Sequence, residues 1–403
     1  MRHRLLRSML TVAIATAGAA IISMSITPTS AQASAASAEG PTVALKTPWG
    51  EPDLEGIWMD EVDTPLQRPT KYAGQEYFTA AQREELDKER SELGRDSRRE
   101  HGTEADLAGT DNTFGWYHKR TAAHTSLVVD PPDGRIPSLT PEAQKAAAAD
   151  REFRLATIQA TETCRTELAQ CRGGKYDPTP SPRRSEPPPR YNATESQRYN
   201  RRDGPEDGSL SERCLSRGLP EFSTALGGSL RRIVQTPGGM SMFYEIPFGQ
   251  GFQRDIVMDG SPHLPASIRQ WFGDSRGHWE GDTLVIDVTN FSPKTDFEGS
   301  RENLHLVERW TRTGPTTLDY VVTIEDPTVW TQPWTVRQEF IRQSDHANRI
   351  YYEPRCIEAN YSLPAILWGS RAEELAFKEG RGPDPATRDT VYSDRASRFD
   401  PFR

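Results

Sequence analysis

The sequence predicts a mainly β protein whose core is an antiparallel meander closed into a β-barrel of the lipocalin or calycin kind. Short strand-like runs follow one another over residues 232–352, turn residues separate most of them, and no alternating βα units occur. About eight or nine such strands can close on themselves and leave no exposed edge. A β-sandwich is the alternative, because sequence alone seldom separates these two architectures.

The clearest local signal is a β-hairpin over residues 278–288. Residues 283–288 alternate aliphatic side chains on one face with a more polar face, which is the period-2 pattern of a strand. Residues 278–280 form the expected partner strand. The loop between them is Gly281-Asp282, in which the glycine supplies the positive φ of a type II′ turn.

Further strands are expected before and after this hairpin. A strand-like run at 125–130 stops at two prolines, which cannot continue a strand ladder. The segment 48–60 is turn-rich and predicts one strand or an extended stretch that packs on the main domain. The remaining candidates lie at 232–235, 240–246, 255–258, 304–309, 318–324, 336–341 and 349–352.

Two helices are predicted in the N-terminal part, and we expect them to pack outside the barrel. The first is a charged, exposed helix over about 79–99, with Thr79 as its N-cap. The second begins at Thr140, which is followed by a proline and an acidic residue, the composition of a helix start. This helix is expected to run towards Cys164.

The first 35 residues have the order of a secretory signal peptide: arginines, an apolar run and small residues with Ala-x-Ala sites. An uncleaved membrane anchor is the alternative, because the apolar run is long for a signal peptide. We expect residues 1–35 to be removed and the mature protein to be secreted, either extracellular or periplasmic, and free of the membrane. The net charge of −9 has both signs interspersed, so no basic surface for nucleic acid is predicted.

Composition divides the rest of the chain. Residues 172–212 hold many prolines and charges and few aliphatic side chains, which predicts a disordered linker or a long loop. Removal of residues 175–210 is expected to change stability little, because loop length is a weak determinant of stability. The segment over residues 172–212 separates an N-terminal extended and helical segment, residues 36–171, from the β-barrel domain, residues 213–370. Residues 371–403 are expected to form a flexible tail.

The four cysteines are expected to form disulfides in an oxidising compartment. Of the three connectivities that four cysteines allow, we favour Cys164–Cys171 with Cys214–Cys356. Seven residues of straight helix span about 10 Å, which exceeds the Cα separation in a disulfide. The helix before Cys171 must therefore end early.

Several phrases taken together resemble an uncharacterised family of exported bacterial proteins. They include TPWGEPDLEGIW, TSLVVDPPDGRIPSLT, GDSRGHWEGDTLVIDVTNF, NLHLVERWTR, EDPTVWTQPWT and CIEANYSLP. The resemblance covers most of the chain apart from the leader, the linker and the tail. It implies a single secreted module with a barrel-like core, and it implies no activity, cofactor or catalytic residue.

The candidate catalytic residues are His305, Glu308 and His263. The first two lie on one predicted strand, and its period of two places them on opposite faces, so only one can face the barrel interior. In an apolar interior either could exchange a proton with a bound molecule. The alternative is a salt-bridged exterior face, which is the more common role of such residues.

Aromatic rings concentrated in the β region are the candidate ligand contacts: Tyr244, Trp310, Tyr320 and Tyr351. Rings line ligand cavities, but they also fill cores. Residues 273–277 match G-x-S-x-G, yet a hairpin follows them instead of the helix that a nucleophile elbow requires. No metal-ligand spacing occurs, so neither a metal nor a cofactor is predicted.

Two functions remain. One is a secreted barrel enzyme that acts on a small, partly apolar organic molecule by cofactor-independent acid/base chemistry, as a lyase, isomerase or hydrolase. The other is a non-catalytic, lipocalin-like binding protein for an apolar ligand. A small molecule is the expected partner in both. A cavity with a desolvated histidine or carboxylate beside a second polar group would favour the enzyme, whereas apolar walls would favour the binding protein.

Overall fold

The computed structural model describes most of the chain beyond the leader. The described residues are 45–60, 62–96, 120–171, 174–193, 199–210, 212–215, 218–222, 230–246, 250–343 and 362–391. The predicted signal peptide, the strand expected at 349–352, Tyr351 and Cys356 lie outside these residues.

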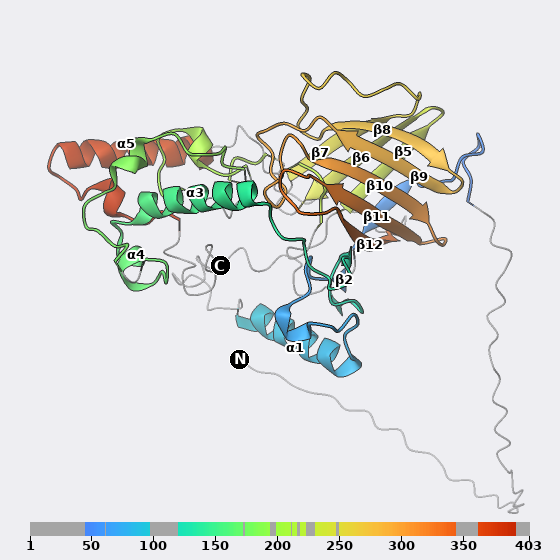
Figure 1. The fold of residues 1–403 in the computed structure, drawn as a ribbon, viewed down its shortest axis with the longest axis horizontal. Helices are drawn as coiled ribbons and strands as arrows, with labels where there is room; N and C mark the ends of the chain where they lie inside the picture. The colour runs from blue at the N-terminus through green and yellow to red at the C-terminus, as the bar shows by residue number, and fades with distance from the viewer. Residues whose placement is uncertain are drawn as a thin grey trace, which may run out of the picture. The chain divides into compact units, whose positions relative to one another are not determined.

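The described strands form a closed β-barrel, which confirms the predicted architecture over the sandwich (Figure 1). Neighbouring strands follow the order β1-β5-β6-β7-β8-β9-β10-β11-β12, and β1 also pairs with β12 to close the ring. The pairings are antiparallel apart from β7 with β8. The strands are β1 (Gly56–Met59), β5 (Leu230–Thr236), β6 (Gly239–Ile246), β7 (Gln250–Val257), β8 (Asp274–Glu280), β9 (Thr283–Thr289), β10 (His305–Arg312), β11 (Thr317–Glu325) and β12 (Trp334–Arg342).

Three further short strands lie among the described residues. β4 (Val128–Asp130) adds to one end of β12, antiparallel to it, and ends before Pro131 as expected. β2 (Val62–Asp63) and β3 (Arg120–Thr121) form a separate parallel pair.

The predicted hairpin is confirmed as β8 and β9. Glu280 pairs with Thr283, so the loop has two residues, and Gly281 has a φ of +60°. Asp282 is not among the residues with positive φ, which agrees with a type II′ turn.

The barrel closes through β1, which comes from the N-terminal segment. Trp58 pairs with Arg231 of β5 on one side and with Arg342 of β12 on the other. Its indole is fully buried and donates to the Leu54 carbonyl oxygen over 2.9 Å. The boundary expected at residue 213 therefore does not separate the barrel from the chain before it. β5 and β12 would otherwise leave open edges, and β1 pairs with both.

The two predicted helix starts are confirmed by their caps. Gln82 N donates to Thr79 Oγ1 over 3.2 Å at the start of α1 (Ala80–Asp96). Thr140 Oγ1 accepts from Ala143 N over 3.2 Å at the start of α3 (Pro141–Ile158). The second helix ends at Ile158, before Cys164, and the chain resumes as α4 (Glu162–Thr166).

The segment expected as a disordered linker or long loop is a loop that packs on α3. Its described residues include the short 3-10 helices η4 (Pro182–Ser185) and η6 (Pro205–Asp207). Arg201 and Asp207 form a buried ion pair of 2.7 Å. The Tyr199 hydroxyl lies 3.0 Å from Asp150 of α3. Buried polar groups with satisfied hydrogen bonds fix this loop where aliphatic side chains are scarce.

Residues 371–391 of the expected flexible tail are described. They begin within α5 (Ser362–Lys378) and contain η8 (Pro385–Thr387). Asn200 of the loop donates to the Arg388 carbonyl oxygen over 3.0 Å and accepts from Thr390 N over 2.9 Å. The tail therefore packs on the loop at these residues. None of the described helices has the length and apolarity to span a bilayer.

Candidate functional site

Glu308 is the member of the predicted pair on β10 that faces the barrel interior. Its carboxylate forms an ion pair with Arg254 of β7, and the side chains are 1 % and 3 % exposed. Tyr320 of β11 donates its hydroxyl to Glu308 Oε1 over 3.0 Å. Arg254 Nε and Nη1 have no hydrogen-bond partner among the described residues.

Glu308, Arg254, Tyr320 and Tyr244 form an interior cluster. In this cluster the ion pair stays charged and the tyrosines stay neutral at neutral pH. Burial works against the charged form of Arg254, but the Glu308 carboxylate raises its pKa. Burial, with Glu308 second, raises the pKa of Tyr320 well above its ordinary value. Burial also raises the pKa of Tyr244 to about 12. At neutral pH the two tyrosines are therefore neutral hydroxyls, and the ion pair is compensated within the barrel.

Three of the predicted ligand contacts lie in this interior and pack on other rings. Trp310 and Tyr320 have centroids 4.1 Å apart. Tyr244 stacks on Phe252 at 4.7 Å. None of the three lines the cavity described below. Their contact with a ligand stays a prediction.

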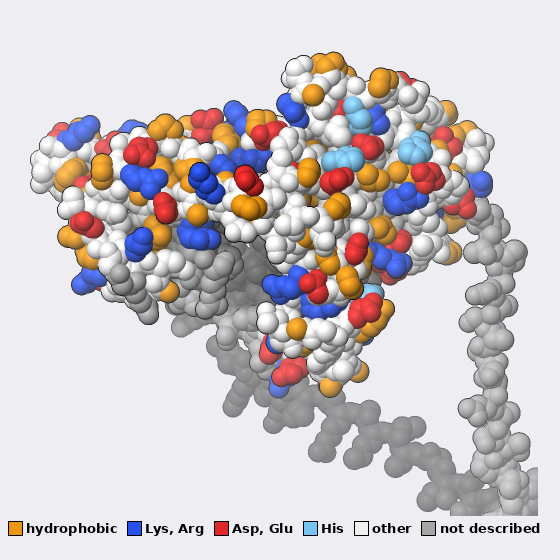
Figure 2. Space-filling model, viewed as in Figure 1, with side chains coloured by type: hydrophobic (Ala, Val, Ile, Leu, Met, Phe, Trp, Pro, Cys, Tyr) orange, Lys and Arg blue, Asp and Glu red, His pale blue; other side chains and the backbone are white. Residues whose placement is uncertain are grey.

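His305 and His263 lie on the outside of the barrel, in one network around Asp287 of β9. Asp287 Oδ1 is 2.8 Å from His263 Nε2, and its Oδ2 is 3.1 Å from His305 Nε2. His263 Nδ1 is 2.9 Å from Asp274, and His305 Nδ1 is 3.3 Å from Glu325. Figure 2 shows histidine side chains beside acidic ones on this surface.

This geometry favours the imidazolium form of His305. Each ring nitrogen faces a carboxylate oxygen, and only a doubly protonated ring donates from both nitrogens. The hydrogen bond that His305 donates to Asp287, opposed by burial, raises the pKa of His305. The hydrogen bond from His305 likewise lowers the pKa of Asp287. The network therefore joins the segment around His263 to Asp274 of β8 and Asp287 of β9.

The network predicts a pH-dependent stability, tested by His305→Gln. The raised pKa of His305 gives a contribution that is complete below 6.5 and lost as pH rises through its folded pKa. The lowered pKa of Asp287 gives a contribution that is complete above 3.8 and lost on acidification. The loss of melting temperature in His305→Gln is expected to be largest between about pH 4 and 6.5.

Thermal unfolding from pH 3 to 9 measures this difference. His278→Gln is the matched control, because His278 is 59 % exposed and, among the described residues, pairs with the exposed Glu280. A destabilisation by His305→Gln that stays constant up to pH 9, or that grows with pH, contradicts the imidazolium assignment.

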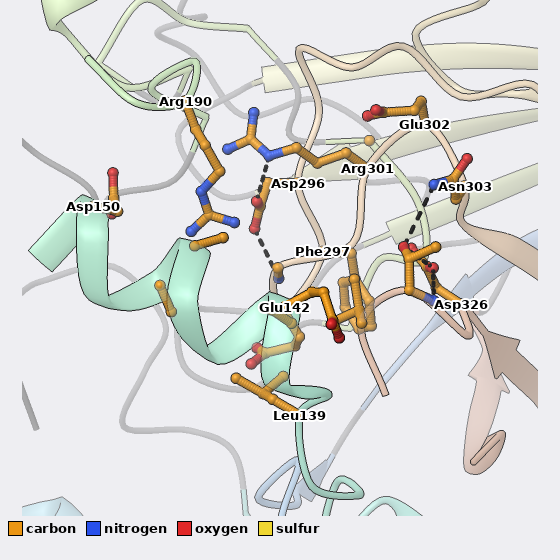
Figure 3. Close-up of a pocket in the computed structure, with 18 of the residues that line it drawn as sticks. Leu139, Glu142, Asp150, Arg190, Asp296, Phe297, Arg301, Glu302, Asn303 and Asp326 are labelled. Carbon is orange, nitrogen blue, oxygen red and sulfur yellow. Dashed lines mark hydrogen bonds and ion pairs between the residues drawn. The ribbon is translucent and has the colours of Figure 1, made fainter. Parts of the chain in front are cut away.

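A cavity of about 790 Å³ lies where α3 meets one end of the barrel (Figure 3). Thr140, at the start of α3, donates its backbone N–H to Val329 and its hydroxyl to the Thr328 carbonyl, which ties the helix to the loop after β11. The volume falls in the range of small-molecule sites, about 300–1,000 Å³.

The walls of the cavity are mixed. The α3 wall presents Ala143, Ala146 and Ala147, spaced so that they share one helix face. Their small side chains leave space between the helix and the barrel. The opposite side holds four apolar residues, Leu219, Phe222, Phe297 and Val329, which form an apolar wall beside the charged and polar residues of the lining.

Phe222 separates the cavity from the interior cluster. It lines the cavity, and its ring centroid lies 6.2 Å from that of Tyr320, which bonds to Glu308. Phe297 packs beside it at 6.0 Å. A molecule in the cavity would rest on these rings and would not reach the ion pair in the present arrangement.

Most buried carboxylates of the cavity have partners. Asp296 pairs with Arg301 at 2.9 Å. Asp326 accepts from Ser300 over 2.5 Å and from the backbone of Thr328 over 2.9 Å. Asp150 pairs with Arg154 at 3.5 Å.

Arg190 differs from these residues. It lines the cavity, and its Nε is buried with no hydrogen-bond partner among the described residues. Sequence reasoning missed both this arginine and the alanine face of α3. The cavity forms between a helix and loops that are far apart in the chain, and neither has a local motif.

Other candidate chemistry receives no support. Gly273 has a φ of +68° and directly precedes β8, and Ser275 is buried within that strand. A nucleophile elbow would instead place its serine on a sharp turn before a helix. Within the described part of the chain, no group of three or more potential ligands could hold a metal ion.

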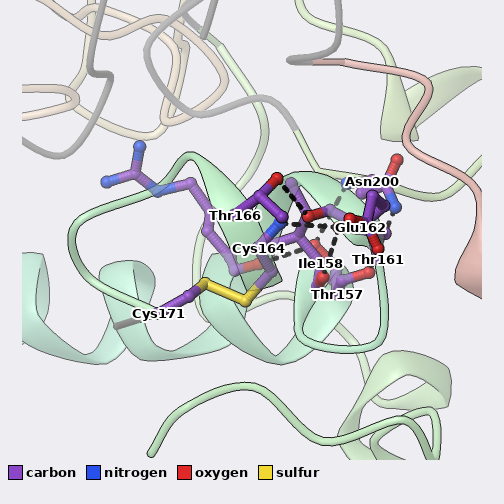
Figure 4. The surroundings of a disulfide bond; sticks show 9 residues. Thr157, Ile158, Thr161, Glu162, Cys164, Thr166, Cys171 and Asn200 are labelled. Carbon is purple, nitrogen blue, oxygen red and sulfur yellow. Dashed lines mark hydrogen bonds between the residues drawn. A yellow bond between two sulfur atoms is a disulfide. The ribbon is translucent and has the colours of Figure 1, made fainter. Parts of the chain in front are cut away.

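The predicted Cys164–Cys171 disulfide is confirmed (Figure 4). Its Cα atoms are 5.2 Å apart, because α4 ends at Thr166 and the chain turns back. It packs with Ile158 and Leu168 in a small core. Cys214 is also disulfide-bonded. Its pairing with Cys356 stays a prediction, since Cys356 lies outside the described residues.

Comparisons with known proteins give two partial likenesses. No family model and no curated protein matches the chain. The secretary abundant heat soluble protein from Ramazzottius varieornatus has 9 % identity and a TM-score of 0.22, and the match covers 33 % of this chain and 82 % of that chain. A variant of the fluorescent protein UnaG has 17 % identity and a TM-score of 0.19, and the match covers 29 % of this chain and 73 % of that chain. The strand order itself defines the lipocalin-like barrel.

Proposed function

We propose that this protein is a non-catalytic binding protein, which takes a small, partly apolar molecule into the cavity between α3 and the barrel end. The observation that carries the proposal is the cavity itself, with a volume of about 790 Å³ and an apolar wall of four residues. Pockets of this size suit small organic ligands. We further propose that binding takes place after export, where disulfides persist.

The positions of the candidate catalytic residues favour binding over catalysis. His305 and His263 lie on the outer surface in ion pairs with carboxylates. Glu308 is buried against Arg254 and covered by rings. A general acid or base must lie within hydrogen-bond reach of the bound molecule. None of the three lines the cavity.

The proposal predicts that filling the cavity abolishes binding. In Ala146→Trp the indole would occupy the space beside the apolar wall. The affinity for N-phenyl-1-naphthylamine, a neutral probe that fluoresces in apolar surroundings, is expected to fall by about tenfold or more. Ala148→Trp is the matched control, because Ala148 lies on the same helix but does not line the cavity.

Fluorescence titration of the mature, disulfide-bonded protein measures these affinities. Circular dichroism verifies that both variants are folded. Wild-type protein that does not bind the probe, or equal binding by the wild type and both variants, contradicts a ligand site at this place.

A further inference from the structure

We infer that the ligand of this cavity is an amphipathic organic anion, whose anionic group binds the Arg190 guanidinium while its apolar part packs on Leu219, Phe222 and Phe297. This inference rests on the proposed function and adds the chemical class of the ligand. Two observations support it: the buried Arg190 Nε has no acceptor among the described residues, and charged side chains are unevenly distributed around it.

The backbone at Arg190 is held on both sides. Its carbonyl oxygen lies 3.2 Å from the Tyr199 hydroxyl, and that hydroxyl also contacts Asp150 of α3. The carbonyl oxygen of the next residue, Tyr191, accepts from Arg301 Nη2 over 2.9 Å. The arginine therefore projects from an ordered stretch of the loop, and Figure 3 shows its side chain extending towards α3.

The guanidinium of Arg190 lacks an acceptor. A guanidinium carries five N–H donors and no acceptor, and a buried donor without a partner is unfavourable. Arg190 Nε is such a donor among the described residues. The nearby carboxylates of Asp150 and Asp296 are already paired with Arg154 and Arg301. A carboxylate, sulfonate or phosphate on the ligand would supply the missing acceptor, because planar guanidinium groups bind such anions with two hydrogen bonds.

The remaining carboxylates set the orientation of the ligand. Four more carboxylates line the cavity: Glu142 and Glu298 are exposed and Glu302 is partly exposed, so water solvates these three, whereas Glu221 is buried. In Figure 3 Glu142 and Glu302 lie away from Arg190, which shares its side of the cavity with Arg301. Like charge keeps an anionic group away from the glutamates and directs it to the arginines. The apolar wall then receives the rest of the molecule.

A matched pair of probes tests the inference. The anionic 8-anilinonaphthalene-1-sulfonate and the neutral N-phenyl-1-naphthylamine share the same ring system and differ by the sulfonate. In Arg190→Gln we expect the affinity for the sulfonate to fall about tenfold or more, and the affinity for the neutral probe to change by less than about twofold. Arg190→Lys keeps the charge and is expected to recover part of the loss.

Arg183→Gln is the control for the removal of one positive charge. Arg183 lies on the same loop, is 40 % exposed and does not line the cavity. It should leave both affinities unchanged. In the wild type, higher salt should weaken binding of the sulfonate but not of the neutral probe, a readout that does not depend on the folding of any variant.

The outcomes separate the two proposals. Equal loss of both probes in Arg190→Gln, or no loss of the sulfonate, overturns the anionic ligand and leaves the binding cavity in place. An absence of salt dependence in the wild type also overturns it. Neutral-probe binding that Ala146→Trp does not reduce overturns the proposed function itself.

Discussion

Glu308→Gln is expected to lower the free energy of unfolding by about 3–5 kcal/mol, because it leaves the Arg254 guanidinium buried without a counter-charge. The two side chains are 3 % and 1 % exposed, so water cannot solvate the remaining cation. Arg254 also has two other nitrogens without partners among the described residues. Denaturation by guanidinium chloride, followed by circular dichroism, measures the loss.

Two further variants show whether the cause is the buried charge. Glu325→Gln removes a carboxylate that is 48 % exposed and should cost less than about 1 kcal/mol. The double variant Glu308→Met with Arg254→Met removes both charges and should recover most of the stability, as replacement of buried ion pairs by apolar residues often does. A Glu308→Gln protein as stable as Glu325→Gln would show that the pair does not hold the interior together.

Asp207→Ala is expected to destabilise the protein by about 3–5 kcal/mol through the loop over residues 172–212. Asp207 accepts from Arg201 over 2.7 Å, and both side chains are less than a tenth exposed. It also accepts from the backbone N–H of Asp203 over 2.7 Å and of Gly204 over 3.1 Å. The variant would leave a buried guanidinium and two backbone donors without these bonds.

Asp203→Ala is the matched control. Asp203 is 62 % exposed and lies 3.7 Å from the same arginine, so its removal should cost about 1 kcal/mol or less. Thermal or chemical unfolding compares the two variants. If Asp207→Ala were no less stable than Asp203→Ala, the loop would contribute little to the fold, and the expectation from composition alone would hold.

The barrel strands could be predicted from the sequence because their signal is local. Alternation with a period of two and a glycine-led loop define β8 and β9 without knowledge of the rest of the chain. β1 is different. It has only four residues, and its pairing with β5 and β12 connects segments that are far apart in sequence. The role of β1 in closing the barrel is therefore recognised from the folded sheet and not from its own sequence.

The interior face of β10 could not be assigned from its own sequence. Both faces carry charged or titratable side chains, so alternation separates His305 from Glu308 but does not say which one is inside. The partner that makes the burial of Glu308 tolerable is Arg254, 54 residues earlier in the chain. A buried carboxylate requires such a counter-charge. This long-range pairing exists only in the folded barrel.

The order of the loop over residues 172–212 and the presence of the cavity could not be predicted from the sequence, for a related reason. Low aliphatic content predicts disorder because hydrophobic burial is then small. In this loop, the buried pair of Arg201 and Asp207 and the contact of Tyr199 with α3 supply a different kind of order. The alanines of α3 predict a helix, yet the space that they leave depends on the barrel loops opposite.

A crystal structure of the protein grown with 8-anilinonaphthalene-1-sulfonate tests the central claim most directly. The account predicts one probe molecule between α3 and the barrel end, with its rings on Phe222 and Phe297 and its sulfonate at Arg190. A probe among Tyr244, Trp310 and Tyr320 inside the barrel would contradict the account, as would a structure in which the cavity stays free of probe at saturating concentration.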